Sequence, residues 1–372
     1  MSDLSFKRSE ILIIGAGVMG VSTACALVKR SRHSNCSITI LDAAAELPNS
    51  LGASVDASRL LRADYAAEPY TRLVSAARES WKDTSSDGWG GEGRYHEAKL
   101  VLTAQPGIEG HVDGYLAESL KNLKELARSE EYGFHLQSLR DLPDRKAIAQ
   151  ESLAPGTSGD FGYVNDQCGW VNAEACVKYA LQKARRLGGD RVKLRTNSRV
   201  RRLLYEADTN LGGDEVRCSG VELQDGSHIY ADLVIVAAGA WTPSLVDLQG
   251  RAAATGQVLA YLPISESEQK TLDASPIYFN ISRGMYMFPP HDNKLKIGRH
   301  GFGYQNPTKV ILPRPTPEAP TASAETFVST PRTDLPIPAE AEMACNEFLA
   351  ELFPHWRNRS FLSTRVCWYC DT

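Results

Sequence analysis

The stretch ILIIGAGVMG, residues 11–20, decides the fold of this chain. Its four leading apolar residues predict a parallel strand buried on both faces, and the glycines predict a tight turn into a helix. A second apolar run, SITILDA, contains Asp42, 22 residues after Gly20. This strand–helix–strand context makes a G-x-G-x-x-G motif strong evidence for a dinucleotide-binding fold.

The residues of this motif have separate tasks. Gly15 permits the tight turn, Gly17 lets the backbone approach a pyrophosphate, and Gly20 lets helix and strand pack closely. The helix N-terminus favours phosphate charge, and Asp42 can bind a ribose hydroxyl pair. The predicted cofactor-binding residues here are Gly15, Gly17, Val18, Met19, Gly20 and Asp42. A structural glycine turn without a ligand is the alternative.

Length and charge exclude several other classes of protein. The chain has 372 residues, enough for two domains, and a formal net charge of −4, which favours neither nucleic acid nor an anionic membrane surface. Its apolar runs are too short to span a bilayer, and its polar N-terminus does not resemble a signal peptide. We expect an intracellular protein, cytoplasmic or peroxisomal, whose eight cysteines are free thiols.

A later group of strands bears on which dinucleotide binds. NSRVRRLLYE, VRCSGVELQDG and HIYADLVIVAAGAW read as strands, with QDGS as a hairpin turn. Such a hairpin, followed by an apolar strand that runs into glycine, is typical of two-domain flavoproteins and favours FAD over NAD. The predicted cofactor-binding residues in this region are Val200, Ala238, Gly239 and Trp241. Two ordinary strands remain the alternative.

Periodicity and proline content describe other segments. VNAEACVKYALQKARRLGG predicts a helix with Asn172 as its N-cap, and AEAEMACNEFLAELFP predicts one that stops at Pro354. YLAESLKNLKELARS has its leucines at helical spacing. Residues 307–338 hold eight of the chain's 19 prolines, and we expect an extended, irregular surface connection there.

Three internal stretches carry polar residues that, from the sequence alone, are most simply interpreted as structural or surface residues. In ASRLLRADY, residues 57–65, two arginines three apart usually mark a solvated face. The tyrosine of GMYMFPP, residues 284–290, suits a core or hairpin position. In KLKIGRHGFGYQNP, residues 294–307, a lysine and a histidine four apart share one face of a strand. A surface lysine on an edge strand is the alternative there.

Strand alternation separates the two cysteines of RVCWYCDT, residues 365–372. Cys367 and Tyr369 share one predicted face, while Trp368 and Cys370 point the other way. Residues three apart in a strand lie about 10 Å apart, which is too far for a disulfide. No helix follows to support a redox pair, and no second C-x-x-C completes a zinc site. A plain core cysteine stays open at this point.

On these stretches the chain resembles the FAD-dependent amine oxidases of the monomeric sarcosine oxidase type. That family includes the fungal fructosyl amino acid oxidases, or amadoriases, and the pipecolate and saccharopine oxidases. The resemblance runs from residue 11 to residue 372 and implies a monomeric α/β two-domain flavoprotein. It implies a Rossmann-like FAD-binding domain over residues 1–85 and 165–252. A substrate domain with a mixed or antiparallel sheet would take residues 86–164 and 253–372.

The resemblance also implies roles in substrate binding. Arg59 would face the substrate carboxylate, for which a planar guanidinium is the natural partner. Arg62 would lie near the flavin ring and its phosphate side, and Ser58 is a further predicted cofactor-binding residue. Tyr286 and Tyr369 would line the substrate pocket.

Three residues would act on the flavin side of the site. Lys296 falls on the family's lysine over the flavin, which activates oxygen because a cation stabilises developing superoxide charge. His300 falls on an active-site histidine. Cys367 falls on the cysteine that is joined through its sulfur to the flavin 8α carbon, so we expect covalent FAD.

The implied activity is oxidation of a secondary amine on an amino acid: N-methyl, N-fructosyl, cyclic or saccharopine-like. Hydride would pass to flavin N5 and give an imine, and dioxygen would be reduced to hydrogen peroxide. The implied partners are therefore a small amino acid-derived amine and dioxygen, with no nucleic acid and no membrane. No metal is expected.

One segment of the family has no counterpart in residues 1–372. Family members continue for several dozen residues past the cysteine motif, with a strand and a glycine-rich turn that seats the flavin. We expect the C-terminal piece of the FAD-binding domain to be missing from this chain. Two alternatives stay open: a catalytically impaired flavin-binding protein, and an NAD(P)-dependent dehydrogenase.

Overall fold

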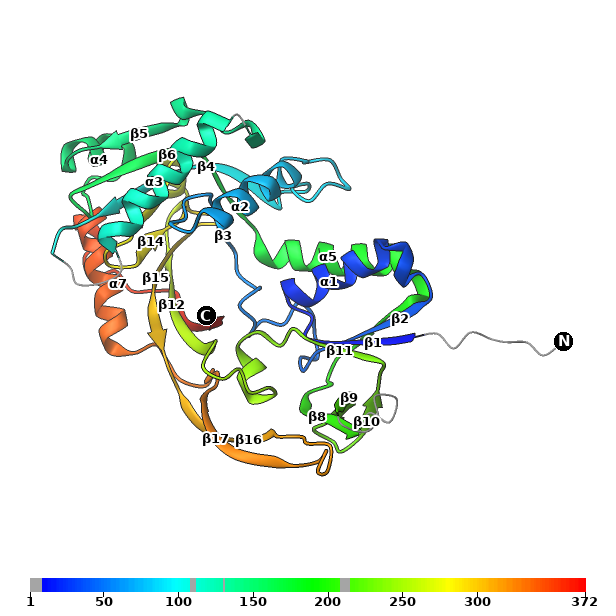
Figure 1. Ribbon diagram of the computed structural model, residues 1–372. Coiled ribbons are helices and arrows are strands. Elements are labelled where there is room, and N and C mark those ends of the chain that lie inside the picture. The colour runs from blue at the N-terminus through cyan, green and yellow to red at the C-terminus, as the bar shows by residue number, and fades with distance from the viewer. Residues whose placement is uncertain (1–8, 108–111, 130, 208–214) are drawn as a thin grey trace.

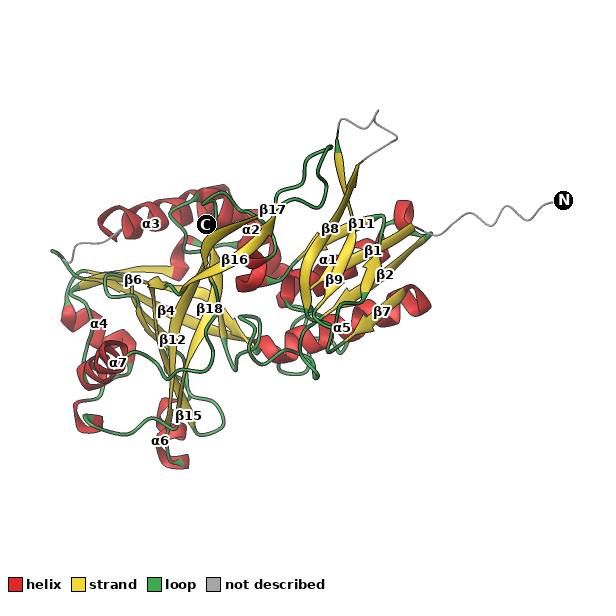
Figure 2. Cartoon of the chain, turned by 90° about the horizontal axis from the view of Figure 1, so that it is seen from below, coloured by secondary structure: helices red, strands yellow, loops and turns green. Residues whose placement is uncertain are grey.

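The computed structural model describes residues 9–107, 112–129, 131–207 and 215–372. The chain forms two halves, each built on its own sheet, and the described C-terminal end lies between them (Figure 1). Figure 2 shows the two groups of strands side by side. Among the described residues, no helix is both long and apolar enough to cross a membrane.

The first half contains a four-stranded parallel sheet in the order β11-β1-β2-β7. Its strands are β1 (Ser9–Ile14), β2 (Cys36–Leu41), β7 (Val192–Arg195) and β11 (Leu233–Val236). Helices α1 (Val18–Lys29) and α5 (Ala173–Gly188) pack against each other on one face. The predicted strand–helix–strand unit is confirmed, and the side chain of Asn172 caps α5 by accepting from Ala175 N at 3.0 Å.

The opposite face of this parallel sheet meets a small antiparallel sheet in the order β10-β9-β8. Its strands are β8 (Val200–Ala207), β9 (Val216–Leu223) and β10 (His228–Tyr230). Ile11 and Ile13 pack toward the helices, whereas Leu12 and Ile14 pack toward the small sheet. Because alternate residues of β1 reach two different cores, the whole run is apolar, as predicted for a doubly covered strand.

Glycine is required at two positions where β1 turns into α1. Gly15 has φ +108°, a conformation that other residues rarely adopt. A Cβ atom at Gly20 would lie 1.9 Å from the carbonyl oxygen of Gly15. The helix can therefore approach the turn only with glycine at position 20.

The second half is built on a nine-stranded sheet in the order β18-β12-β15-β14-β13-β4-β6-β3, with β5 also paired to β6. All of these pairs are antiparallel except β4 with β13, so the sheet is mixed, as expected. The strands are β3 (Arg59–Leu61), β4 (Tyr95–Ala104), β5 (Leu139–Leu142), β6 (Phe161–Val171), β12 (Ala253–Pro263), β13 (Ile277–Asn280), β14 (Met285–Met287), β15 (Lys294–Tyr304) and β18 (Ser363–Asp371).

Helices cover most of this sheet but leave one end of one face open to the other half. Helix α7 packs on β12 and β15 through Phe348 and Leu349, and α3 packs on the opposite face of β4 and β6. The uncovered end, made by β12, β15 and β18, looks toward the parallel sheet (Figure 1). The helices of this half are α2 (Glu68–Trp81), α3 (Val112–Ser129), α4 (Arg145–Ser152), α6 (Glu266–Leu272) and α7 (Ala339–Leu352).

The proline-rich region differs from the expected irregular connection. It forms a regular antiparallel ribbon of β16 (Pro307–Pro313) and β17 (Ser323–Ser329). Proline is tolerated because a two-stranded ribbon has two free edges, and Pro307 and Pro313 stand at the ends of β16. Ser329 Oγ donates to the carbonyl oxygen of Ala254 at 2.6 Å, which joins the ribbon to β12.

The domain boundaries predicted at residues 85, 164 and 252 are not tested by the strand order and stay predictions. The sheets place β3 and all of β6 in the larger sheet, whereas β7 to β11 belong to the first half. The segment between β2 and β3 therefore passes from one half to the other.

Candidate active site

The N-terminus of α1 is shaped to receive a phosphate group. Its N-cap, Gly17, makes no side-chain cap, and Val18 and Met19 are exposed by 51% and 68%. Ser54 Oγ accepts from Val18 N at 2.9 Å and brings the following loop beside the helix. A helix N-terminus with glycine as its N-cap fits the pyrophosphate of a dinucleotide.

Asp42 lies at the end of β2 beside this turn, and it is 7% exposed. Its carboxylate accepts from Ala16 N at 2.9 Å, Ala44 N at 2.9 Å and Asn49 Nδ2 at 3.0 Å. These bonds fix the carboxylate at the carboxyl edge of the parallel sheet, where such folds bind ribose.

The other predicted cofactor-binding residues of the first half lie on the small sheet and on the segment that follows β11. Val200 and Ala238 are partly buried against the small sheet and its neighbours. The end of β11 lies against the glycine turn, because a Cβ atom at Gly15 would meet Ala237 O at 2.4 Å. Trp241 packs with Trp368 of β18, so the segment after Gly239 bridges toward the larger sheet. Their contacts with a cofactor stay predictions.

A buried charge cluster lies where the second half faces the first. Lys296 Nζ donates to Asp56 Oδ2 at 2.7 Å and to the carbonyl oxygen of Ser58 at 2.5 Å. Tyr261 donates to Asp56 Oδ1 at 2.6 Å. Arg59 Nη2 lies 3.4 Å from Asp56 Oδ2. The Asp56 carboxylate therefore contacts two cations and accepts a hydrogen bond from one phenol.

The cluster changes the acidity of its members. Burial lowers the pKa of Lys296 to about 8, although Asp56 opposes the effect. Burial by itself would raise the pKa of Asp56, but Lys296 and Arg59 hold it below its usual value. Burial and Asp56 raise the pKa of Tyr261, so its hydroxyl stays a donor. Near neutral pH the Asp56 carboxylate is therefore charged, and the Lys296 amine changes its protonation about one pH unit above neutrality.

Strand β18 adds the cysteine and tyrosine that the sequence singled out. Arg59 donates to the hydroxyl of Tyr369 and lies 3.1 Å from Cys367 Sγ through Nη2. Trp368 points to the other face and donates to Arg332 O at 2.9 Å. All eight cysteines are free thiols, so the expected separation of Cys367 from Cys370 is confirmed.

Tyr286 and His300 extend the site along β14 and β15. A Cβ atom at Gly298 would lie 2.4 Å from the hydroxyl oxygen of Tyr286, so this phenol lies directly over the glycine. Gly298 stands between Lys296 and His300 on β15. The ring of His300 meets that of Tyr369 edge to face at 5.9 Å, and burial lowers its pKa. The structure thus brings Lys296, His300, Tyr286 and Tyr369 together.

Arg62 lies apart from this charge cluster. Its guanidinium stacks near Tyr65, Tyr115 and Phe279 at 4.7, 5.7 and 5.6 Å from the ring centres. It donates to the hydroxyl of Tyr115 at 3.1 Å and to the backbone oxygen of Asp64. Phe279 in turn packs on Tyr286, with ring centres 6.0 Å apart. Arg62 therefore approaches the site from the substrate-domain side.

Sequence reasoning missed three residues of the site: Asp56, Tyr261 and Arg365. Arg365 Nη2 donates to Val55 O at 2.5 Å and lies 3.7 Å from Cys367 Sγ. Strand alternation from Cys367 could have revealed Arg365, since the two are two residues apart. Asp56 could have been noticed as a carboxyl group three residues before Arg59. Nothing in the sequence alone points to Tyr261.

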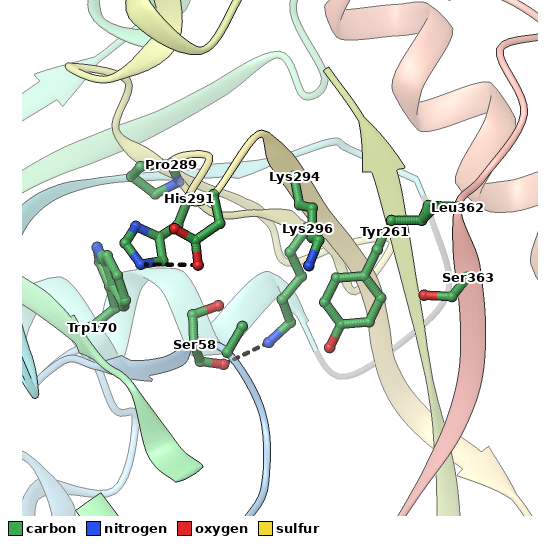
Figure 3. A pocket seen from close by; sticks show the side chains of 11 residues that line it. Ser58, Trp170, Tyr261, Pro289, His291, Lys294, Lys296, Leu362 and Ser363 are labelled. Atoms are coloured by element: carbon green, nitrogen blue, oxygen red, sulfur yellow. Dashed lines mark hydrogen bonds and ion pairs between the residues drawn. The ribbon is translucent and has the colours of Figure 1, made fainter. Parts of the chain in front are cut away.

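A cavity of about 280 Å³ reaches this cluster from outside (Figure 3). Lys296, Ser58 and Tyr261 form part of its wall, and Trp170 closes one side. Its lining residues are Ala57, Ser58, Trp170, Tyr261, Pro289, His291, Asp292, Lys294, Lys296, Leu362 and Ser363. Arg59 and Cys367 are not among the residues that line it.

This fold and site define a flavin-dependent oxidoreductase: a dinucleotide-binding sheet faces a substrate sheet that carries a buried lysine. Residues 10–371 match the model of the FAD dependent oxidoreductase family, known as DAO. The chain belongs to this family, and FAD is its cofactor.

The chain is similar to two curated fungal enzymes. It is 28% identical over 410 residues to the amino acid oxidase imqH of Aspergillus flavus, covering 98% of this chain and 84% of that protein. It is 26% identical over 377 residues to the L-saccharopine oxidase of Schizosaccharomyces pombe, covering 97% and 80%. Both are named as oxidases.

Solved structures show the same fold. Fructosamine oxidase (Amadoriase II) of Aspergillus fumigatus superposes with a TM-score of 0.74 at 24% identity, covering 98% of this chain and 76% of that one. A fructosyl peptide oxidase from Aspergillus nidulans gives a TM-score of 0.77 at 22% identity, covering 98% and 80%. The expected family and fold class are confirmed.

The close approach of Tyr286 to Gly298 can be tested by substitution. We expect Gly298→Ala to displace the Tyr286 ring and to lower the free energy of unfolding by about 1–3 kcal/mol, as overpacking does. Gly301→Ala on the same strand is the matched control, because a Cβ atom there meets nothing within 4 Å. Urea unfolding measures both. Equal stability of the two variants would contradict the close contact.

Proposed function

We propose that this protein is an oxidase of secondary amines on amino acids, with dioxygen as the electron acceptor. The observation that carries the proposal is the buried Lys296 ammonium, held by Asp56 beside Arg59, Cys367 and Tyr369 on the sheet face that looks toward the dinucleotide-binding half. FAD, when bound, supplies the acceptor for the substrate hydride and passes the electrons to dioxygen. The relatives named amino acid oxidase and saccharopine oxidase support this substrate class.

The chain's own residues supply charge and placement. A fixed cation stabilises negative charge that develops on dioxygen, and it does so best where water is excluded. Lys296 is 4% exposed and already bonded to Asp56 and Ser58, so it needs no rearrangement during the reaction. The pKa of about 8 leaves it mostly charged at neutral pH. We therefore assign Lys296 to oxygen activation.

Two arginines compete for the substrate carboxylate. Arg59, the residue favoured by the sequence, is already paired with Asp56 and bonded to Ala53 O at 2.8 Å. Arg62 has no ion pair among the described residues. Asp64 offers it only a backbone oxygen, while the Asp64 carboxyl group, whose pKa is raised by burial, bonds to Asn165 at 3.0 Å. Asp64 attracts Arg62 without a direct ion pair, so the Arg62 guanidinium is more available to an anionic ligand than that of Arg59.

The aromatic residues around Arg62 suit the remainder of such a substrate. Tyr65, Tyr115 and Phe279 surround the guanidinium, and Tyr286 lies next to Phe279. Burial raises the pKa of Tyr286, so its phenol stays neutral and can donate to a substrate oxygen. His300, whose pKa is lowered, would be neutral and able to accept a proton from the substrate amine.

We propose covalent attachment of FAD through Cys367. Its sulfur is 2% exposed and lies between two guanidinium groups, those of Arg59 at 3.1 Å and Arg365 at 3.7 Å.

Acid precipitation tests the covalent bond. We expect the yellow colour to stay with the precipitated wild-type polypeptide and to be released into the supernatant from Cys367→Ser. Cys370→Ser is the matched control, because Cys370 lies on the other face of β18, and it should retain the colour. Release of all colour from the wild type would refute the attachment, whereas a colourless protein before precipitation would count against the oxidase itself.

Stopped-flow spectroscopy tests the role of Lys296. We expect Lys296→Met to slow flavin reoxidation by dioxygen by about 10²–10³-fold, because one preorganised charge is lost. Anaerobic flavin reduction by substrate should change far less. Lys294→Met, an exposed neighbour on the same strand, is the control. A variant that loses reduction but keeps reoxidation would remove the assignment.

Substitution by lysine separates the two arginines. Lysine keeps the charge but loses the bidentate geometry that an arginine offers a carboxylate. We expect Arg62→Lys to raise KM for the amino acid by about 10-fold or more, and Arg59→Lys to alter mainly the flavin spectrum and reoxidation. A raised KM in Arg59→Lys and not in Arg62→Lys would instead assign binding of the substrate carboxylate to Arg59.

Two other readings have distinct outcomes in a peroxide assay with sarcosine, pipecolate, saccharopine and a fructosyl amino acid. A flavin-binding but impaired protein would be yellow and give no peroxide with any of them. An NAD(P)-dependent dehydrogenase would lack flavin absorption and respond to added nicotinamide cofactor. A yellow protein that gives peroxide supports the proposed oxidase.

A further inference from the structure

We propose that Asp56 is a positioning residue for Lys296: its carboxylate fixes the amino group in place and keeps it charged beside Arg59. The catalytic meaning of this inference rests on the proposed oxidase function. The effect of Asp56 on the charge of Lys296 rests only on the geometry of the cluster. An experiment can therefore refute this effect and the oxidase function separately.

The geometry leaves Lys296 a single anionic partner among the described residues. Its Nζ lies 2.7 Å from Asp56 Oδ2, and the side chains are 5% and 0% exposed. Its other bonded partner, the carbonyl oxygen of Ser58, is neutral. A buried ammonium without a paired charge tends to lose its proton. The Asp56 carboxylate therefore holds both the position and the charge of the amine.

Asp56 is in turn held from two other elements. Tyr261 of β12 donates to Oδ1, and Arg59 lies 3.4 Å from Oδ2. Since Asp56, Ser58 and Arg59 belong to one short segment, the carboxylate joins this crossing segment to β12 and β15. The carboxylate cannot turn away from Lys296 without breaking these contacts.

Two cations around one carboxylate leave the cluster with an excess positive charge. Arg59 repels the Lys296 ammonium, and Asp56 attracts it. Removal of Asp56 would leave two neighbouring buried cations, of which only the lysine can lose its proton near neutral pH. The titratable and charged groups that face Lys296, from all the elements around it and its cavity, are Asp56, Arg59, Tyr261, Cys367, His291, Asp292 and Lys294.

The cavity lets Lys296 exchange protons with solvent. It is lined by exposed residues such as Lys294 and Ser363 and ends on Lys296 and Ser58 (Figure 3). The protonation of the amine can therefore follow the bulk pH. Small labelling reagents can use the same path.

Competitive labelling measures this protonation without relying on catalysis. Trace acetic anhydride is added to the purified full chain at several pH values, and mass spectrometry compares Lys296 with Lys294 as the reference on the same strand. In the wild type, labelling should rise with a midpoint near pH 8. In Asp56→Asn the midpoint should fall by about 1–3 pH units, the usual effect of losing an adjacent opposite charge. Labelling at pH 7 should rise up to about tenfold.

Two further variants separate charge from disrupted packing. Arg59→Gln removes a like charge and should shift the midpoint upward, opposite to Asp56→Asn. This variant keeps the proposal testable if Asp56→Asn does not fold. Tyr261→Phe is the matched control: it removes one hydrogen bond to Asp56 but keeps the ion pair, so its midpoint should not fall. General loosening would shift all three variants the same way and would overturn the proposal.

Reoxidation gives the second readout. The ammonium is the active form, so the wild-type rate should fall as pH rises through about 8, and that of Asp56→Asn should fall at lower pH. An unchanged labelling midpoint in folded Asp56→Asn overturns the inference. A lowered midpoint in a chain that binds no flavin would support the ion pair while removing the oxidase proposal.

Discussion

The contact of Asp56 with Lys296 is the constraint on which the site depends. The chain leaves the dinucleotide-binding sheet after β2, crosses to the other half, and enters the nine-stranded sheet as β3. Asp56 lies on this crossing and is bonded to β15 through Lys296 and to β12 through Tyr261. One buried carboxylate thereby ties the crossing segment to two strands of the larger sheet. It also sets the charge at the point where the two meet.

The sequence predicted the parts of this protein that depend on local rules. The glycine turn of β1 and α1 needs no distant information, because a positive φ and a tight helix approach admit only glycine there. The separation of Cys367 from Cys370 followed from strand alternation alone. The regular ribbon of β16 and β17 was missed because prolines at strand ends look, in sequence, like prolines in a loop. The family resemblance, rather than periodicity, supplied Lys296, His300, Tyr286 and Tyr369.

The missed residues share a physical reason. Asp56 and Lys296 are 240 positions apart in sequence, and Tyr261 stands on a third element. Their roles arise only when β12, β15 and the crossing segment come together. Arg59 and Arg62 illustrate the same limit, since the family resemblance places Arg59 at the substrate carboxylate and Arg62 near the flavin. Only the folded chain shows that Arg59 makes a direct ion pair, whereas Arg62 makes none among the described residues.

This difference suggests different roles for the two arginines. A guanidinium already paired with Asp56 gains less from a second carboxylate than one without a direct ion pair does. Arg59 therefore suits the fixed electrostatics around Lys296 and Cys367, where charge must not depend on substrate. Arg62, set among aromatic rings, suits a ligand that comes and goes. The cavity at Lys296 is lined by neither arginine, so it meets the charge cluster through the lysine, Ser58 and Tyr261.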